Sequence, residues 1–189
     1  QGSINSIYYN NGLFIGKKNE VYRYNEETAN FDLYYQLPNG SLDIFCMHID
    51  KGYLWIGTTT NGVYRLNIDK KELEHPIRKG NIISFYRDSG GELWIGSWEE
   101  GLFHVKTNGK IENFKYDAKN PHSLSSNFVR ACCEDNLGNI WIGTFNGLNR
   151  YNKSTGLFQN HTANDIQSDG LTHSSIWCIV KDNQGTLWL

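Results

Sequence analysis

The sequence predicts an all-β fold built from β-propeller blades, as an incomplete propeller fragment of about four and a half blades. One observation is a recurring stretch in which an aromatic residue is followed by Ile and Gly, clearest at Trp55, Trp94 and Trp141 and looser at Phe14. The aromatic position falls at residues 14, 55, 94, 141 and 188, in steps of 41, 39, 47 and 47 residues. The other is that few long stretches carry helical periodicity, whereas four short β-rich runs fill each step, which is typical of propeller blades.

Each repeat is expected to hold four antiparallel strands separated by turn residues. In the second repeat the strands are predicted at 44–49, 53–58, 63–66 and 73–77. The same pattern predicts strands at 6–10, 13–17, 21–24 and 31–36, at 82–87, 93–97, 102–105 and 111–116, and at 129–134, 140–144, 148–151 and 158–161. A fifth repeat begins with a strand at 176–181 and stops inside its second strand at Leu189.

We expect a single propeller fragment over residues 1–189, with blades at about 4–40, 41–80, 81–127 and 128–175 and a partial blade at 176–189. Four and a fraction blades do not close a ring, so an open arc would expose apolar blade faces. Alternatively, the rest of a longer parent ectodomain or another copy of the chain would cover those faces.

The first strand of each repeat is expected to be covered on both sides. When these strands are aligned on the Asp at 50, 88, 135 and 182, a small residue recurs four positions earlier: Cys46, Ser84, Ala131 and Cys178. A small residue in a constant register indicates close approach of a neighbour on that face. The opposite face carries Met47, Phe85, Cys132 and Ile179. The repeated Trp would then fill the gap between adjacent blades, and its burial would stabilise each by about 2 to 3 kcal/mol.

The four cysteines are compatible with two disulfides, a metal set or simple packing. Their spacing fits no paired-cysteine zinc pattern, and adjacent Cys132 and Cys133 should point to opposite faces of a strand. Packing is the favoured interpretation, because a buried Cys behaves as a small apolar residue. The redox compartment stays open.

Composition narrows the classes of partner. The net charge of −2 argues against a broad nucleic-acid surface, which needs an excess of Lys and Arg. No run of roughly eighteen or more apolar residues occurs, so we expect no membrane contact by these residues. Gln1-Gly2-Ser3 has no feature of a signal peptide, which says little about compartment if the chain is an excised piece.

The Asp-x-x-Gly turns at 88–91, 135–138 and 182–185 are interpreted as structural hairpin turns. A calcium-binding hand would need Gly at its sixth position and Glu at its twelfth, where the turn that starts at Asp135 has Ile140 and Asn146. In a hairpin the Asp would cap the turn and the Gly would adopt a positive φ.

Recognition is expected on the face that carries the connections between second and third strands. The crossovers between blades reach the same face, and the extra residues of the later repeats fall in them, at 117–127 and 163–175. Two of the connections supply candidate ligand-binding residues: Trp98, Glu99, Glu100, Phe145 and Asn146. Aromatic rings beside amides and carboxylates suit an oligosaccharide, through ring stacking and hydroxyl hydrogen bonds. The alternative, that Trp98 and Phe145 simply pack on neighbouring loops, stays open.

No catalytic residue, metal site or cofactor is predicted. The sequence has no nucleophile elbow, phosphate loop or zinc-protease helix, and its six histidines are scattered singly. Adjacent Glu99 and Glu100 suit a solvated acidic rim, because a glycosidase pair must face one bond across about 5 to 10 Å. A catalytic propeller, such as a polysaccharide lyase or glycosidase, is the alternative from another class, and a purely structural scaffold is a third.

Two stretches carry a family resemblance: 120–130, which reads Asn-Pro-His-Ser-Leu-Ser-Ser-Asn-Phe-Val-Arg, and 134–151, which reads Glu-Asp-Asn-Leu-Gly-Asn-Ile-Trp-Ile-Gly-Thr-Phe-Asn-Gly-Leu-Asn-Arg-Tyr. They resemble the two-component regulator propeller repeat, found in the sensor ectodomains of hybrid two-component systems of Bacteroides-type bacteria. The resemblance is weaker in the first repeat, where Phe14 replaces Trp, and in the third, where His104 replaces Arg.

The resemblance implies a non-catalytic sensor in the periplasmic ectodomain of an inner-membrane protein, with an oligosaccharide from glycan breakdown as its ligand. In that family, propellers and an immunoglobulin-like domain precede a membrane helix, a histidine kinase core, a receiver and a DNA-binding domain. Kinase activity would therefore reside in domains outside these residues. The repeat motif has no fixed ligand residue, so the resemblance implies no site.

Overall fold

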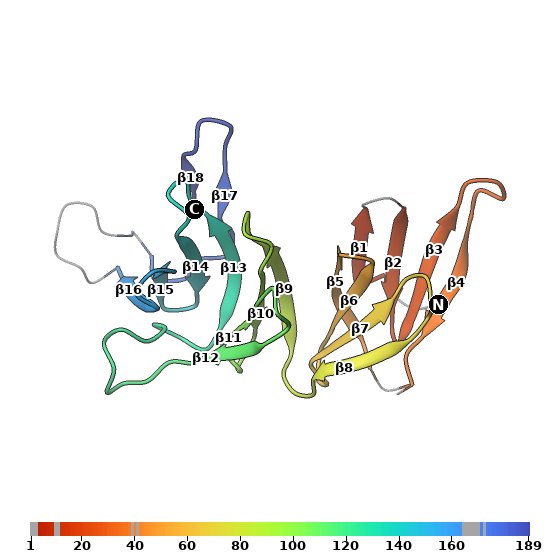
Figure 1. Cartoon of the computed structure of the whole chain (residues 1–189), viewed down its shortest axis with the longest axis horizontal. Coiled ribbons are helices and arrows are strands. Elements are labelled where there is room, and N and C mark those ends of the chain that lie inside the picture. The colour runs from red at the N-terminus through yellow and green to blue at the C-terminus, as the bar shows by residue number, and fades with distance from the viewer. Residues whose placement is uncertain (1–3, 10–11, 39, 41, 164–170, 172) are drawn as a thin grey trace. The chain divides into compact units, whose positions relative to one another are not determined.

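The computed structural model describes residues 4–9, 12–38, 40, 42–163, 171 and 173–189. The chain falls into two compact units, Gln1–Ile83 and Ser84–Leu189. The described residues form strands, turns and bends and no helix, which confirms the all-β prediction (Figure 1).

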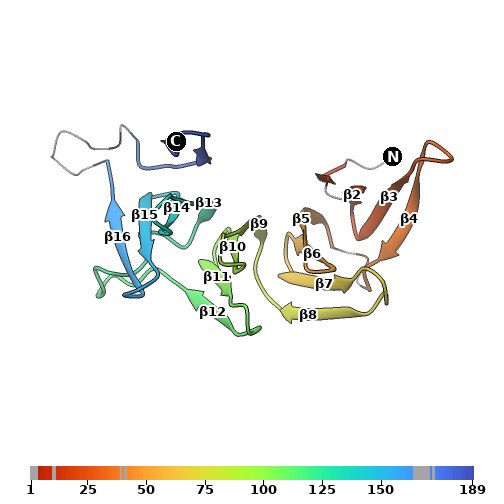
Figure 2. The same cartoon turned by 45° about the horizontal axis from the view of Figure 1, so that its top comes forward.

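The first unit holds two four-stranded antiparallel sheets, with the strand orders β1-β2-β3-β4 and β5-β6-β7-β8. Within each sheet, every strand after the first pairs with the strand before it (Figure 1), and Figure 2 shows the second sheet, β5 to β8, from another side. The strands are β1 (Ser6–Tyr9), β2 (Leu13–Lys17), β3 (Glu20–Asn25), β4 (Asn30–Gln36), β5 (Ile44–Asp50), β6 (Tyr53–Thr58), β7 (Val63–Asn67) and β8 (Leu73–Ile77).

The second unit holds two more four-stranded sheets, β9 to β12 and β13 to β16, and a two-stranded sheet of β17 and β18. These sheets follow the same sequential pairing, so the propeller-blade fold and the count of about four and a half blades are confirmed. The strands are β9 (Ile82–Arg87), β10 (Leu93–Ser97), β11 (Leu102–Val105), β12 (Ile111–Phe114), β13 (Val129–Glu134), β14 (Ile140–Thr144), β15 (Gly147–Asn152), β16 (Leu157–His161), β17 (Val180–Lys181) and β18 (Leu187–Trp188).

The fifth repeat departs from the prediction of a strand at 176–181. Only Val180–Lys181 is a strand, paired with Leu187–Trp188. Because Val180 faces Trp188 in this register, the partners of residues 176–179 would begin at Leu189. Ile176 is held instead by a hydrogen bond from its N–H to the Thr144 carbonyl, 2.9 Å long. The blade bounds drawn from the sequence, and the single domain, stay predictions.

The Gly of the repeated stretch lets the next first strand approach closely. A Cβ added to Gly57 would lie 2.7 Å from the Cys46 sulfur and 2.7 Å from a methyl group of Ile82. A Cβ on Gly143 would lie 2.6 Å from a methyl group of Ile176. All three distances are far inside van der Waals contact, so a side chain at either Gly would force its neighbours to shift. The predicted crowding beside the small residue of the first strand is therefore confirmed at Cys46, whereas Cys178 of the fifth repeat is exposed.

Aromatic side chains of the repeated stretch fill the space between successive sheets, as predicted. Phe14 of β2 is buried in one cluster with Met47 and Leu54 of the following sheet. Trp94 of β10 is fully buried in a cluster with Cys132 and Tyr151 of the following sheet. This burial joins the sheets within each unit.

All four cysteines are free, so no disulfide forms in this structure. Cys132 belongs to the Trp94 cluster and Cys133 to a separate cluster with Ile176, so the two neighbours point to opposite faces as predicted. Burial raises the pKa of the Cys46 and Cys132 thiols, which keeps them protonated and apolar.

The Asp-x-x-Gly turns cap as predicted and also bind the Trp six residues later. Gly91 has φ 79°, and the Asp88 Oδ1 accepts a hydrogen bond from the Glu92 N–H, 2.8 Å long. The Trp94 Nε1–H donates to the Asp88 Oδ2 at 2.9 Å. Trp141 and Trp188 donate in the same way to Asp135 and Asp182, at 2.8 and 2.9 Å. The second oxygen of each Asp thus fixes the orientation of the Trp ring, which is fully buried at Trp94 and exposed at Trp188.

Asp88 also belongs to an ion cluster that links the third and fourth sheets. The Lys153 Nζ lies 2.8 Å from the Asp88 Oδ2 and 3.0 Å from the Glu134 Oε1. The Ser89 N–H donates to the Glu134 Oε2 at 2.7 Å. Burial alone would raise the Asp88 pKa, but the hydrogen bonds from Lys153, Trp94 and the Glu92 N–H outweigh it and hold that pKa below its usual range.

One face of the first sheet is apolar and exposed. Ile7 and Tyr9 are 69% and 80% exposed, and Leu33 is exposed on the same face. Ile7 pairs with a β2 residue in the register in which Met47 pairs with a β6 residue, and Met47 is buried against the first sheet. The exposed face of the first sheet thus corresponds to a face that the second sheet buries.

Candidate functional site

The connections that carry the predicted site residues are anchored by a buried hydroxyl. The Ser97 Oγ donates to the Gly101 carbonyl at 2.7 Å and accepts from the Glu100 N–H at 2.9 Å. The Thr144 Oγ1 donates to the Gly147 carbonyl at 2.9 Å and accepts from the Asn146 N–H at 3.2 Å. Each connection therefore leaves its strand in a fixed conformation, with Trp98 or Phe145 directly after the anchor.

Phe128 brings the two predicted aromatic residues together. The Trp98 ring centre lies 5.2 Å from that of Phe128, at an interplanar angle of 66°. The Phe145 ring centre lies 5.8 Å from that of Phe128, at 46°. The rings thus pack on a neighbour, yet Trp98 and Phe145 stay 38% and 57% exposed. The geometry agrees with packing between loops and leaves ring surface open for a ligand.

Arg130 of β13 extends this surface to a second tryptophan. The Arg130 guanidinium carbon lies 5.4 Å from the Trp98 ring centre and 3.3 Å from that of Trp177. Trp177 is 71% exposed. A guanidinium over an aromatic face is a favourable cation–π arrangement. We call the set Trp98, Phe128, Arg130, Phe145 and Trp177 the aromatic–arginine patch.

The polar candidates lie on the loops beside the patch. The Glu100 Oε2 forms an ion pair with the Lys115 Nζ, 2.8 Å long. Glu99 and Asn146 are exposed. Glu100 is thus part of a charged rim, as predicted for adjacent carboxylates on one loop.

The sequence-based site lacked Phe128, Arg130 and Trp177. A usable signal existed, because Arg130 and Trp177 occupy the same register of their first strands, directly before the recurring small residue. Phe45 and Ile83 occupy this register in the second and third repeats. A change from apolar residues to Arg and Trp at one register indicates a local role in the fourth and fifth repeats.

The crossover at 117–127 packs onto the fourth sheet. Leu124 is fully buried, and the Asn149 side chain accepts from the Ser125 N–H at 2.8 Å and donates to the Ser125 Oγ at 2.9 Å. The Phe158 N–H donates to the His122 carbonyl at 3.2 Å. The extra residues of this crossover thus pack against the fourth sheet and form hydrogen bonds with it. Most of the other long crossover, at 164–170 and 172, lies outside the described residues.

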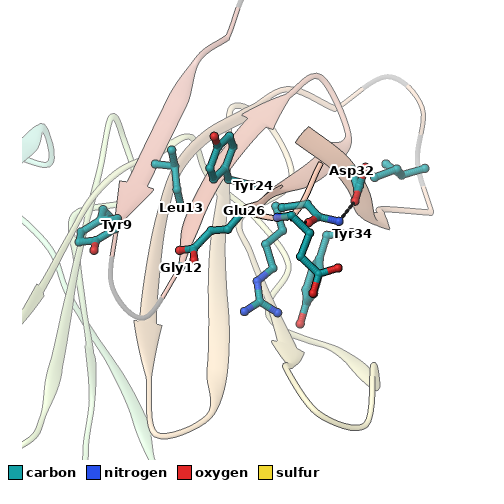
Figure 3. A pocket seen from close by; sticks show the side chains of 11 residues that line it. Tyr9, Gly12, Leu13, Tyr24, Glu26, Asp32 and Tyr34 are labelled. Carbon is teal, nitrogen blue, oxygen red and sulfur yellow. Dashed lines mark hydrogen bonds between the residues drawn. The ribbon is translucent and has the colours of Figure 1, made fainter. Parts of the chain in front are cut away.

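A second candidate surface is an open hollow at the edge of the first sheet, with a volume of about 960 Å³. Figure 3 shows tyrosines and carboxylates around it. The Asn25 Nδ2 donates to the Asp32 Oδ2 at 2.8 Å, which fixes one wall. Tyr9 and Leu33 line the hollow and also belong to the exposed apolar face of that sheet. The hollow is therefore continuous with a surface suited to packing.

The part of the chain that the structure describes contains no group of three or more His, Cys, Asp or Glu residues placed to hold a metal ion. No helix in those residues is long and apolar enough to cross a membrane.

Three segments match the family model described as two component regulator propeller, at residues 76–99, 123–146 and 170–189. The second of these covers most of the repeat on which the resemblance was based. No curated protein matches the chain.

Solved structures with the same fold include two from Bacteroides thetaiotaomicron. The extracellular domain of a protein named as a hybrid two component system is 26% identical, with a TM-score of 0.74, over 100% of this chain and 25% of that chain. The extracellular domain of a protein named as a one component system is 19% identical, with a TM-score of 0.57, over 98% of this chain and 32% of that chain. A protein named as a gluconolactonase is 13% identical, with a TM-score of 0.63, over 99% of this chain and 71% of that chain. The last two likenesses show the fold alone, and this chain spans a quarter to a third of the two extracellular domains.

Proposed function

We propose that this chain, which carries repeats of the two component regulator propeller family, is part of the sensor ectodomain of a bacterial two-component signalling protein. The single observation that carries the proposal is the likeness to the extracellular domain of a hybrid two component system, 26% identical along the whole chain. The three matched repeats support it. The ectodomain would lie in the periplasm and belong to a protein anchored in the inner membrane.

In this proposal the chain binds and does not catalyse. The connections after Ser97 and Thr144 hold Trp98 and Phe145 on anchored loops with ring surface exposed. Exposed rings stack on the C–H faces of sugars, and the neighbouring amide and carboxylates supply hydrogen bonds to hydroxyls. The ligand class that this surface fits is an oligosaccharide from glycan breakdown.

A calorimetric titration of oligosaccharides into the complete ectodomain that contains this chain tests the proposal. We expect heat of binding from at least one oligosaccharide and weaker binding by the Trp98→Ala and Phe145→Ala variants. Trp188→Ala is the matched control, because Trp188 is an exposed aromatic residue outside the patch. Chromatography of each oligosaccharide after incubation with the ectodomain reports catalysis. Cleavage would replace the sensor proposal with the enzyme alternative, and an absence of binding would remove the oligosaccharide.

The exposed apolar face of the first sheet belongs to the same proposal. The corresponding face of the second sheet is buried against another blade, so a further blade of the same repeat, from the parent ectodomain, fits the face of Ile7, Tyr9 and Leu33. An Ile7→Lys change in the ectodomain tests this. A lower melting temperature than that of the parent supports a covered face, and an unchanged one contradicts it.

A further inference from the structure

The aromatic–arginine patch contains a cation with unpaired donors. The Arg130 Nε and Nη1 are buried and have no hydrogen-bond partner among the residues that the structure describes. A buried donor that has lost water without gaining a partner is unfavourable, more so on a charged group. The Trp98 and Trp177 rings attract the guanidinium but offer it no lone pair. Arg130 thus lacks an acceptor.

Two carboxylates near this region pair elsewhere, and a third, Glu99, is exposed to solvent. Glu100 pairs with Lys115. Glu134, in the same strand as Arg130, pairs with Lys153 and accepts from the Ser89 N–H. These ion pairs leave the charge of Arg130 available to an external anion.

The rings around Arg130 define the rest of the ligand. Trp98, Phe145 and Trp177 expose between 38% and 71% of their surface. Trp177 precedes the first paired residue of its repeat, Val180, so this ring is able to move on the guanidinium without breaking a strand pair. A ligand that satisfies both features has a ring with one apolar face and a planar or multidentate anionic group.

We propose that the patch binds an acidic sugar, whose carboxylate or sulfate pairs with Arg130 and whose ring stacks on the exposed tryptophans. The guanidinium fork matches either anion through two parallel hydrogen bonds, which an ammonium group does not provide. This inference rests on the proposed sensor function and narrows its ligand class from oligosaccharides to those with an anionic ring.

The test is a calorimetric titration of the complete ectodomain with three matched series of disaccharides: uronic acids, sulfated sugars, and neutral sugars of the same linkages. We expect at least one acidic series to bind more than about tenfold tighter than its neutral counterpart, with affinity that falls as salt rises. The uronic and sulfated arms distinguish the two anions. This comparison uses the unmutated protein, so it does not depend on the folding of any variant.

Three variants locate the anion site. Arg130→Gln should weaken acidic binding at least tenfold, and Arg130→Lys should restore only part of it because the fork is lost. Arg150→Gln is the matched control, because Arg150 also lies over a tryptophan, Trp141 at 6.0 Å, outside the patch. It should leave affinity unchanged.

The outcomes distinguish a failure of the acidic-ligand inference from a failure of the proposed sensor function. Binding of neutral sugars with equal or greater affinity overturns the acidic ligand and leaves the sensor proposal intact. Acidic binding that Arg130→Gln leaves unchanged in a folded protein overturns the role of the patch. Silence of all three series overturns both the acidic ligand and the oligosaccharide.

Discussion

The second and third sheets carry the same repeat but close their first hairpins differently. Between β5 and β6 the turn is Lys51-Gly52, and both residues have positive φ, 48° and 78°, as in a two-residue type I′ turn. Between β9 and β10 the turn is one residue longer, and only its Gly91 has positive φ. The aromatic residue therefore follows the Asp by five positions in the second repeat and by six in the third.

That single residue decides whether the indole finds a partner. The Trp94 Nε1–H reaches the Asp88 carboxylate, whereas the Trp55 Nε1 is buried with no hydrogen-bond partner among the described residues. Trp55 is still buried, with the Arg65 guanidinium 5.3 Å from its ring centre. Both sheets therefore keep a buried aromatic side chain at this position, whereas the Asp–Trp hydrogen bond is an additional interaction that the second sheet lacks.

The same comparison explains His104 in the third repeat. Arg65 and His104 face the repeated Trp at the same cross-strand position. The His104 ring stacks on Trp94 with centres 3.7 Å apart and lies 2.9 Å from a Glu92 oxygen. Burial lowers the His104 pKa despite Glu92, so the ring that stacks on Trp94 is favoured in its neutral form. The neutral His104 ring thus covers the face of Trp94 at the position where the Arg65 guanidinium lies over Trp55.

Removal of the aromatic volume should have the largest effect. Trp94→Ala should lower the free energy of unfolding by about 3 to 5 kcal/mol, because it leaves a cavity in a fully buried cluster. Trp188→Ala is the control, since that ring is mostly exposed, and should cost far less. Urea denaturation followed by circular dichroism measures both. Similar losses for the two variants would contradict the role of the buried Trp as the filler between sheets.

Removal of the Asp88 carboxylate should have the second largest effect on the free energy of unfolding. Asp88→Asn should cost about 2 to 3 kcal/mol, because it breaks the ion pair of the buried Asp88 carboxylate with the solvent-accessible Lys153 and weakens the bond to Trp94. Asp182→Asn removes the same turn carboxylate at an exposed site and should have a smaller effect. Denaturation midpoints of the two variants give the comparison. An Asp88→Asn midpoint equal to that of the parent would show that the ion cluster does not stabilise the second unit.

The ion cluster should also make the second unit sensitive to acid. The pKa values of Asp88 and Glu134 are both lowered in the folded protein. Their contribution to folding stability is therefore fully present above the ordinary carboxyl pKa values, which are near 4, and is lost as the pH falls through the lowered values. Stability should therefore drop below about pH 4. Lys153→Met should lose stability at pH 7 and show a shallower acid dependence. Parallel curves for the parent and this variant would exclude the cluster as the cause.

The regular part of the fold was predictable because its signals are local. Turn residues and short β-rich runs placed the strands of the first four repeats to within a few residues, and the recurring Gly and small residues indicated the close approach of successive strands. The prediction for the fifth repeat was wrong at residues 176–179, because the structure pairs only Val180 and Lys181 of that run, with Trp188 and Leu187. The strand preference of a short segment does not by itself determine which residues it pairs with.

The candidate site was harder because it assembles from distant segments. Trp98 and Phe145 were predictable from their loops, but the contacts of Phe128 with both rings and of Trp177 with Arg130 form only when three repeats pack together. The sequence around Arg130 predicts only a strand, and its contacts with the rings of Trp98 and Trp177 are visible only in the structure. Sequence periodicity identifies what the repeats share, whereas recognition depends on what one repeat changes.

A smaller change isolates the indole N–H from the ring. Trp94→Phe and Trp55→Phe both remove one ring of the indole, but only the first breaks a hydrogen bond to a carboxylate. The loss of unfolding free energy should be about 1.5 kcal/mol larger at Trp94. Chemical denaturation of the two variants measures the difference. If Trp55→Phe costs as much as Trp94→Phe, the Asp–Trp bond contributes nothing beyond packing.

The smallest expected effect comes from giving the second sheet the longer turn. Insertion of one Ser between Asp50 and Lys51 restores the spacing of six between the Asp and Trp55, so the buried Nε1 gains a charged acceptor. The gain should be about 1 kcal/mol, because satisfying an orphaned donor is offset by the entropy of a longer turn. The same insertion combined with Trp55→Phe is the control and should bring no gain, since Phe has no donor. A midpoint that rises equally in both would assign the stabilisation to the turn backbone, and one that falls in both would show that the type I′ turn is the better closure for this hairpin.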